Sequence, residues 1–143
     1  MKAIPQGYRA VHDLIVRQDM MVDFEQSEAG LGKLHQVYST YWMAKHIELV
    51  SRKLILPFLE PDEEGIGFEL SVKHIAAALP GMRVDLIADY ERTDRNRIYA
   101  SCDVFNELGD KIGEGTTTQV VMRRDHLLEN FASLGARWEL SRG

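Results

Sequence analysis

Residues 37–59 read VYSTYWMAKHIELVSRKLILPFL, with no glycine and a single proline at position 57. Apolar side chains recur in this segment at the spacing of an α-helix, at Met43, Ile47, Val50 and Leu54. We predict one long helix that begins at Ser39 or Thr40 and runs to about residue 59. Because further apolar residues lie on its other sides, more than one neighbouring element should cover this helix.

The segments around this helix have the patterns of strands and turns. Two short segments that favour strands precede it, at residues 10–16 and 20–24, and a polar loop follows them at 26–33. After a loop at 60–65, period-two alternation marks four segments, at residues 67–75, 84–90, 98–104 and 111–123. Asp125 can then cap a short C-terminal helix over residues 126–134, which Gly135 ends.

This order of elements predicts an α+β architecture, in which an antiparallel sheet of about five strands wraps around one long helix. The length of 143 residues fits a single domain, with a core at about residues 10–131. A helix that is apolar on nearly every side also needs a cover beyond one curved sheet. We therefore expect a homodimer or a higher homo-oligomer.

Composition excludes several classes of function. The net charge of −5, from 22 acidic and 17 basic residues, disfavours a nucleic-acid-binding surface. Cys102 is the only cysteine, and the histidines other than His74 share no ligand spacing, so neither a disulfide nor a metal site is expected. The N-terminus lacks the apolar run of a signal peptide, and no segment has the ~20 apolar residues of a membrane helix. We expect a cytoplasmic protein without a membrane partner.

The first strand after the helix carries a histidine where an apolar residue is expected. Alternation in GFELSVKH, residues 67–74, puts Phe68, Leu70 and Val72 on one face, and His74 falls on the same face. His74 is either a core histidine bonded to a backbone carbonyl or a functional group.

Two polar residues of the helix have similarly open roles. Thr40 could be a helix N-cap, and Glu48 could form a surface ion pair with Arg52 or Lys45. If the helix packs on the strand, however, Glu48 and His74 could meet at the edge of the interface. Partial burial would then move the pKa values of both groups towards neutrality.

Three segments resemble the fluoroacetyl-CoA thioesterase-like group of the hotdog-fold thioesterases: VYSTYWMAKHIELVSRKLILPFL (37–59), GIGFELSVKHIAAALPGMRV (65–84) and IGEGTTTQVVMRRDHL (112–127). The resemblance extends from about residue 12 to 131. In that group a Thr, a Glu eight residues later and a His twenty-six residues further form the active site, and Thr40, Glu48 and His74 have this spacing. Gly67 matches a glycine of the acyl-binding region, and Leu34 stands where the family has an aromatic lid residue.

The resemblance implies a hotdog fold and hydrolysis of an acyl-CoA thioester, with no cofactor except the CoA of the substrate. Glu48 would act as nucleophile or as the base for water, His74 as general acid/base, and Thr40 would hold the carboxylate or the substrate carbonyl. This chain has Leu34 at the lid position, and it has Ala78-Leu79 where the family often has a Thr. Both differences argue against specificity for the fluoroacetyl group. We expect a small or medium acyl group instead.

Two other functions are compatible with a hotdog fold. A non-catalytic acyl-CoA-binding module would bind ligand without turnover. A hydratase or dehydratase would carry an Asp-x-x-x-x-His type of motif, and we find no matching pair in the sequence.

Overall fold

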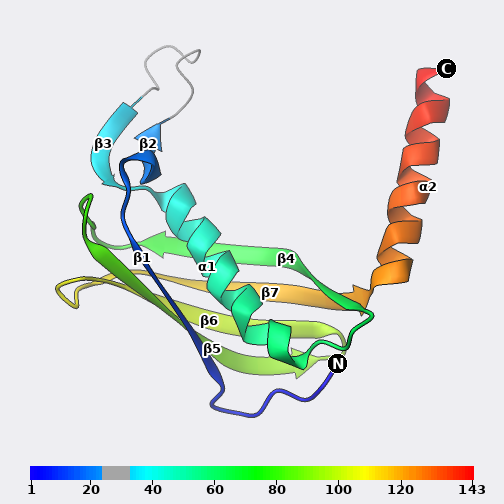
Figure 1. Cartoon of the computed structure of the whole chain (residues 1–143), viewed down its shortest axis with the longest axis horizontal. Coiled ribbons are helices and arrows are strands. Elements are labelled where there is room, and N and C mark those ends of the chain that lie inside the picture. The colour runs from blue at the N-terminus through cyan, green and yellow to red at the C-terminus, as the bar shows by residue number, and fades with distance from the viewer. Residues whose placement is uncertain (24–32) are drawn as a thin grey trace.

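The computed structural model describes residues 1–23 and 33–143, with side chains at 1–23 and 35–143. Five strands form one antiparallel sheet in the order β1-β5-β6-β7-β4. Their bounds are β1 (Arg9–Ile15), β4 (Glu63–His74), β5 (Arg83–Asp94), β6 (Arg97–Asn106) and β7 (Lys111–Arg123). The long helix α1 (Thr40–Ile55) lies across one face of this sheet, and β1 and β4 form the two sheet edges (Figure 1). This is the α+β arrangement that the sequence predicts.

Helix α1 begins where the sequence predicts and ends earlier. Ser39 is its N-cap, because the Ser39 hydroxyl oxygen accepts a hydrogen bond from the backbone N–H of Trp42 at 3.3 Å. The helix ends at Ile55 and passes into a 3₁₀ turn, η2 (Leu56–Phe58). Pro57 explains this end, since proline has no N–H group and its ring crowds the preceding turn.

The core lies between α1 and the inner face of the sheet. The predicted stripe residues of α1 are all fully buried: Met43, Ile47, Val50 and Leu54. Two glycines of β7 make room for them, because a Cβ atom at Gly113 would meet the Met43 side chain and one at Gly115 would meet Ile47. Cys102 is buried in this core, as its alternation predicts.

Strand β4 differs from its prediction in two ways. It begins at Glu63, within the predicted loop, and its pairing with β7 is interrupted by a β-bulge between Gly67 and Glu69. The bulge inserts Phe68 as an extra residue and turns its side chain outwards, where it is 56% exposed beneath the guanidinium of Arg97. The prediction that Phe68 shares the inner face is therefore wrong.

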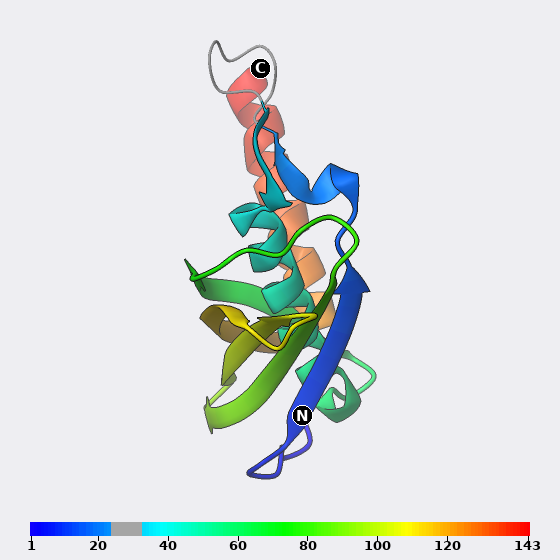
Figure 2. The ribbon, with the colours of Figure 1, turned by 90° about the vertical axis from the view of Figure 1, so that its left-hand side faces the viewer.

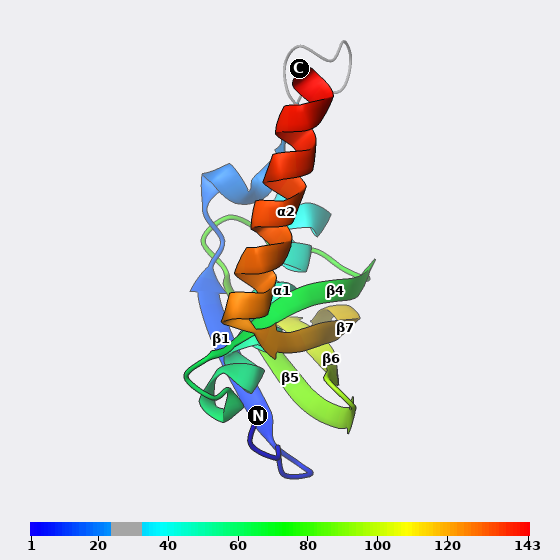
Figure 3. The same cartoon turned by 90° about the vertical axis from the view of Figure 1, so that its right-hand side faces the viewer.

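A small ribbon and a terminal helix extend from this core. Strands β2 (Met21–Asp23) and β3 (Lys33–Tyr38) pair with each other beside the start of α1, after a 3₁₀ turn, η1 (Gln18–Met20) (Figure 2). Helix α2 (Arg124–Arg142) follows β7 directly and stands away from the sheet (Figure 3).

The prediction of a short helix ended by Gly135 is wrong. Helix α2 continues through Gly135, whose φ angle is not positive. Asp125 lies in the first turn of α2, and Arg123 is the N-cap residue instead. Within the described ranges, no helix is both long enough and apolar enough to span a lipid bilayer.

A histidine is buried on the side of α1 that faces away from β4. His46 is 6% exposed, and its ring packs beside those of Tyr38, Trp42 and His12 at centroid distances of 5.8, 5.7 and 6.2 Å. The Tyr38 hydroxyl lies 2.6 Å from Nδ1 of His46. Burial raises the pKa of Tyr38, so its hydroxyl stays protonated beside the imidazole. Burial also lowers the pKa of His46 to about 4.

This buried imidazole predicts acid-sensitive stability. The folded-state pKa of His46 is lowered from 6.5 to about 4, so the unfolded chain binds the extra proton first as the pH falls. The stabilisation is complete above about pH 6.5 and declines below it, by of order 2 kcal/mol at about pH 5. We expect His46→Gln to remove this component when unfolding free energies by urea are compared at about pH 7.5 and pH 5. His126→Gln, an exposed substitution on α2, should leave the pH dependence of wild type unchanged.

Candidate active site

The structure brings Thr40 and His74 together at one end of α1. Thr40 is the first residue of α1 and His74 the last of β4, and the Thr40 hydroxyl is 2.8 Å from Nδ1 of His74. Because Ser39 is the N-cap, the capping role considered for Thr40 is wrong. The ring of His74 is half-buried on the inner face of the sheet, and the backbone of His74 pairs with Gly113 of β7.

The environment of His74 favours a neutral imidazole. Burial lowers the pKa of His74 below its ordinary value of 6.5, and a backbone hydrogen bond at Ala76 offsets part of this shift. The hydrogen bond with Thr40 engages Nδ1 and fixes the orientation of the ring. A neutral, oriented imidazole whose other nitrogen is not held by Thr40 can serve as a general acid/base.

Glu48 of α1 and Gly67 of β4 form a second contact between these two elements. The Glu48 oxygen Oε1 is 3.0 Å from the position that a Cβ atom on Gly67 would occupy. The surface pair considered with Arg52 is not formed within the described residues, because Arg52 donates to the carbonyl of Gly65 at 2.8 Å and lies 4.0 Å from Glu64. Glu48 is exposed to solvent on this side of the helix.

A cavity of about 200 Å³ adjoins Glu48 between α1, β4 and β7. It is lined by Glu48, Ser51, Gly67, Phe68, Glu69, Leu70, Thr117, Thr118 and Gln119. The hydroxyl oxygens of Ser51 and Thr117 are buried without a hydrogen-bond partner among the described residues. Such hydroxyls can bind a polar ligand atom, since each otherwise leaves its hydrogen-bonding capacity unused.

The sequence reasoning missed Ser51, Thr117 and Gln119. A signal was present in the stretch TTTQ, residues 116–119, because alternation places every second residue on the face where the glycines of β7 meet α1. The amide of Gln119 lies on that face and donates to the backbone carbonyl of Ser51 at 2.8 Å. This bond ties β7 to α1 beside the cavity.

Within one chain the predicted site residues form two separate contacts. Thr40 contacts His74, and Glu48 contacts Gly67. Glu48 comes eight residues after Thr40 in α1, which places their Cα atoms about 12 Å apart. Both helix residues point to the β4 side of α1. The predicted lid residue Leu34 lies outside the residues whose side chains the structure describes. Among those that it does describe, no group of three or more His, Cys, Asp or Glu side chains is placed to bind a metal ion.

The closeness of Gly67 to Glu48 makes a substitution there informative. In Gly67→Ala the new methyl group would stand 3.0 Å from Glu48 Oε1 and would narrow the cavity. The flexible carboxylate can move by a few tenths of an ångström, so we expect the melting temperature to change little. If Glu48 takes part in the reaction, we expect kcat/KM to fall by ~10-fold or more, because a small displacement of a reacting group is costly. Unchanged kinetics with acyl-CoA would show that Glu48 does not act from this position.

Comparisons with known proteins identify the family of this chain. The family model of fluoroacetyl-CoA-specific thioesterases matches residues 16–125. A fluoroacetyl-CoA thioesterase of Streptantibioticus cattleyicolor is 28% identical over 126 residues, which cover 87% of each chain.

Two solved structures extend the comparison. A Thermus thermophilus protein described as a thioesterase superfamily member is 50% identical, with a TM-score of 0.93 over 98% of this chain and 99% of that chain. A fluoroacetyl-CoA thioesterase structure has a TM-score of 0.82 and 23% identity over 92% of this chain and 98% of that one, which supports the fold alone. The predicted hotdog fold is confirmed. The chain therefore belongs to the fluoroacetyl-CoA-specific thioesterase family, and with it to the acyl-CoA thioester hydrolases.

Proposed function

We propose that this protein hydrolyses the thioester of a small or medium acyl-CoA in the cytoplasm, at a site built from Thr40, Glu48 and His74. The observation that carries the proposal is the hydrogen bond between Thr40 and His74, in a family whose members are thioesterases. Gly67 and Leu34 would border the acyl group. The cavity beside Glu48, about 200 Å³, favours the smaller acyl groups. CoA enters as part of the substrate, and no other cofactor is needed.

A dimer would unite the two contacts into one site. Strand β4 is an edge of the sheet, and no strand of the described residues pairs with its outer side. An edge strand of 12 residues is a ready template for pairing with another copy. We propose a homodimer in which the two β4 edges pair antiparallel about a two-fold axis at Leu70 and Ser71, near the middle of the strand and midway between Gly67 and His74.

This symmetry sets Glu48 of one copy near Thr40 and His74 of the other. Gly67 and Glu48 lie towards the Glu63 half of β4, whereas His74 is its other end. Antiparallel pairing about the middle of β4 brings the His74 end of one strand beside the Glu63 half of its partner. Each of two active sites would then take Thr40 and His74 from one chain and Glu48 from the other.

The chemistry of such a site follows from these groups. The Glu48 carboxylate attacks the thioester carbonyl or deprotonates a water that attacks it, which gives a tetrahedral oxyanion. The buried hydroxyls of Ser51 and Thr117 and the backbone N–H groups near Gly67 are available to donate to that oxygen. When Glu48 deprotonates water, that proton passes through His74 to the CoA thiolate as the C–S bond breaks. When Glu48 is the nucleophile, breakage of the C–S bond leaves an acyl anhydride on Glu48; a water hydrolyses this anhydride, and the proton that the water releases reaches the thiolate through His74. The net reaction consumes one water and releases the free acid and CoA thiol.

A panel of acyl-CoA esters from acetyl to octanoyl, assayed for release of free thiol, tests the activity. We expect turnover with the highest kcat/KM at the short end of the panel, in line with the size of the cavity. Saturable binding across the panel without thiol release would instead favour the non-catalytic binding module.

Mixing two inactive variants tests the shared site. Glu48→Ala and His74→Ala chains are refolded together at equal amounts, and thiol release is compared with each variant alone. If each site draws on both chains, mixed dimers contain one intact site, and the mixture regains about a quarter of wild-type activity. If each site lies within one chain, no mixed dimer has an intact site, and the mixture stays as inactive as its components.

A further inference from the structure

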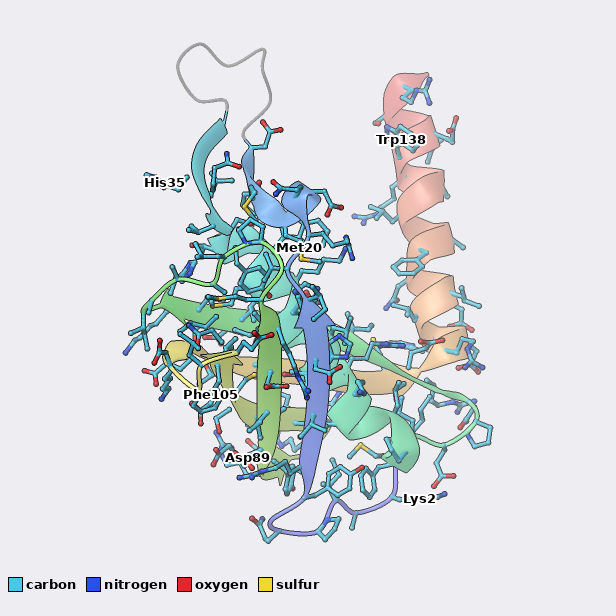
Figure 4. All side chains as sticks on the ribbon, turned by 60° about the vertical axis from the view of Figure 1, so that its left-hand side comes forward. Lys2, Met20, His35, Asp89, Phe105 and Trp138 are labelled. Atoms are coloured by element: carbon cyan, nitrogen blue, oxygen red, sulfur yellow. The ribbon has the colours of Figure 1, made fainter. Side chains whose placement is uncertain are left out.

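Helix α2 carries a stripe of four apolar side chains, of which three are exposed and one, Leu127, is half-buried. Its members follow at intervals of four, three and four residues, at Leu127, Phe131, Leu134 and Trp138. This spacing places them on one side of the helix, as in the seam of a coiled coil. Phe131, Leu134 and Trp138 are 58, 56 and 59% exposed, and Figure 4 shows Trp138 near the free end of α2, far from the sheet.

A helix of this kind is not stable by itself. None of the 19 residues of α2 is buried, and most helical stability in proteins comes from packing of an apolar face. Gly135 inside the helix lowers its intrinsic stability further, by about 1 kcal/mol relative to alanine. The stripe therefore requires a cover that one copy of the chain does not supply.

The first turn of α2, which we call its root, lies beside the edge strand β4. Arg123, the last residue of β7, pairs with Glu63 at the start of β4. The backbone N–H of Arg124 donates to the carbonyl of Asp62 at 2.8 Å, and Arg124 Nε donates to Glu64 at 2.9 Å. From this root α2 rises past the open edge of β4, on the side away from β5 and β6 (Figures 1 and 3). The space that it borders is the space in which a second copy would pair.

The two-fold axis proposed above decides what part of a second copy meets α2. Since α2 starts at the Glu63 end of β4, antiparallel pairing brings it beside the His74 end of the other strand. At that end each copy exposes apolar side chains of its own: Tyr41, 42% exposed, follows Thr40, and Ile75, 55% exposed, follows His74. Charge does not suggest another partner, because three arginines and three carboxylates balance along α2, which suits neither an anionic membrane nor a nucleic acid.

We propose that the apolar stripe of α2 packs against a second copy of this chain, over Tyr41 and Ile75, and forms the outer wall of that copy's Thr40–His74 site. The inference rests on the dimer of the proposed function. The match to the family model ends at residue 125, so nearly all of α2 lies beyond it, whereas the Thermus thermophilus structure spans 98% of this chain at a TM-score of 0.93. Helix α2 is thus within the part of the chain that this structure matches and outside the matched family region.

Disulfide trapping tests this contact without reference to activity. In a chain carrying Ile75→Cys and Phe131→Cys, the first cysteine follows the His74 end of β4, and the second lies on α2, which starts at the Glu63 end. The 12 residues of β4 span about 40 Å, so these two cysteines cannot bond within one chain. Mild oxidation is expected to give a covalent dimer on a non-reducing gel. The matched control is Ile75→Cys with Glu129→Cys, which puts the thiol on the opposite side of α2. Cys102 does not interfere, because it is buried and burial raises its pKa to about 12.

The outcomes separate this inference from the proposed function. Strong trapping by Phe131→Cys and weak trapping by Glu129→Cys supports the contact, whether or not the protein hydrolyses thioesters. Equal trapping by both variants, no trapping in a protein that light scattering shows to be dimeric, or a monomer in solution would overturn it. A ladder of larger covalent species would also overturn it, since the contact would then join separate dimers.

Discussion

Replacing Glu48 by glutamine is expected to lower kcat for acyl-CoA hydrolysis by ~10²–10⁴-fold, because a neutral amide can neither attack the thioester nor deprotonate water. The fold should be unaffected. Glu48 is exposed, and its surface neighbour Arg52 is held instead by the carbonyl of Gly65 and by Glu64. We therefore expect the melting temperature of Glu48→Gln to match wild type, and binding of a non-hydrolysable acyl-CoA analogue to persist.

Glu69→Gln is the matched control for this change. Glu69 lines the same cavity from β4 and is also exposed, so its substitution removes a carboxylate of the same charge from the lining of the same cavity. We expect its kcat to stay within a few-fold of wild type. If thiol release by Glu48→Gln remained near the wild-type rate, Glu48 would be a surface residue of α1 and the assignment of the catalytic carboxylate would be wrong.

Most of the fold could be predicted because its signals are local. The stripe from Met43 to Leu54 identifies the helix, and the period-two pattern of residues 111–123 gives the bounds of β7 as the structure has them. The errors lie at single residues where the chain does not follow the local signal. Phe68 fits an alternating strand, but the bulge beside Gly67 turns it outwards. Gly135 is a typical helix end, yet α2 continues through it.

The candidate site was predictable only in part. The types and spacing of Thr40, Glu48 and His74 are sequence properties, and the contact between Thr40 and His74 agrees with them. The separation of Glu48 from that contact depends on how α1 crosses β4, which no spacing along the chain specifies. The role of Ser51 and Thr117 is equally hidden, because their hydroxyls become notable only once burial leaves them without partners among the described residues.

The substitution His74→Gln should separate a catalytic histidine from a structural one. A glutamine amide can keep a hydrogen bond to Thr40, and the ring of His74 is only half-buried, so the melting temperature should fall little. Turnover should drop by ~10²-fold or more, since the amide cannot carry a proton to the CoA thiolate. Affinity for a non-hydrolysable acyl-CoA analogue should remain near that of wild type.

The pH profile gives this prediction a second readout. Burial lowers the pKa of His74 below 6.5, so the imidazole is neutral at neutral pH and gains a proton only in mild acid. If the resting enzyme needs neutral His74, the wild-type kcat should be level near neutral pH and fall as the pH drops through this lowered pKa. The same acid limb should be missing from the residual activity of His74→Gln. The variant could instead have a much lower melting temperature than wild type and keep both its kcat and the fall of kcat at acid pH. His74 would then be a structural residue, and Glu48 alone would have to account for thioester hydrolysis.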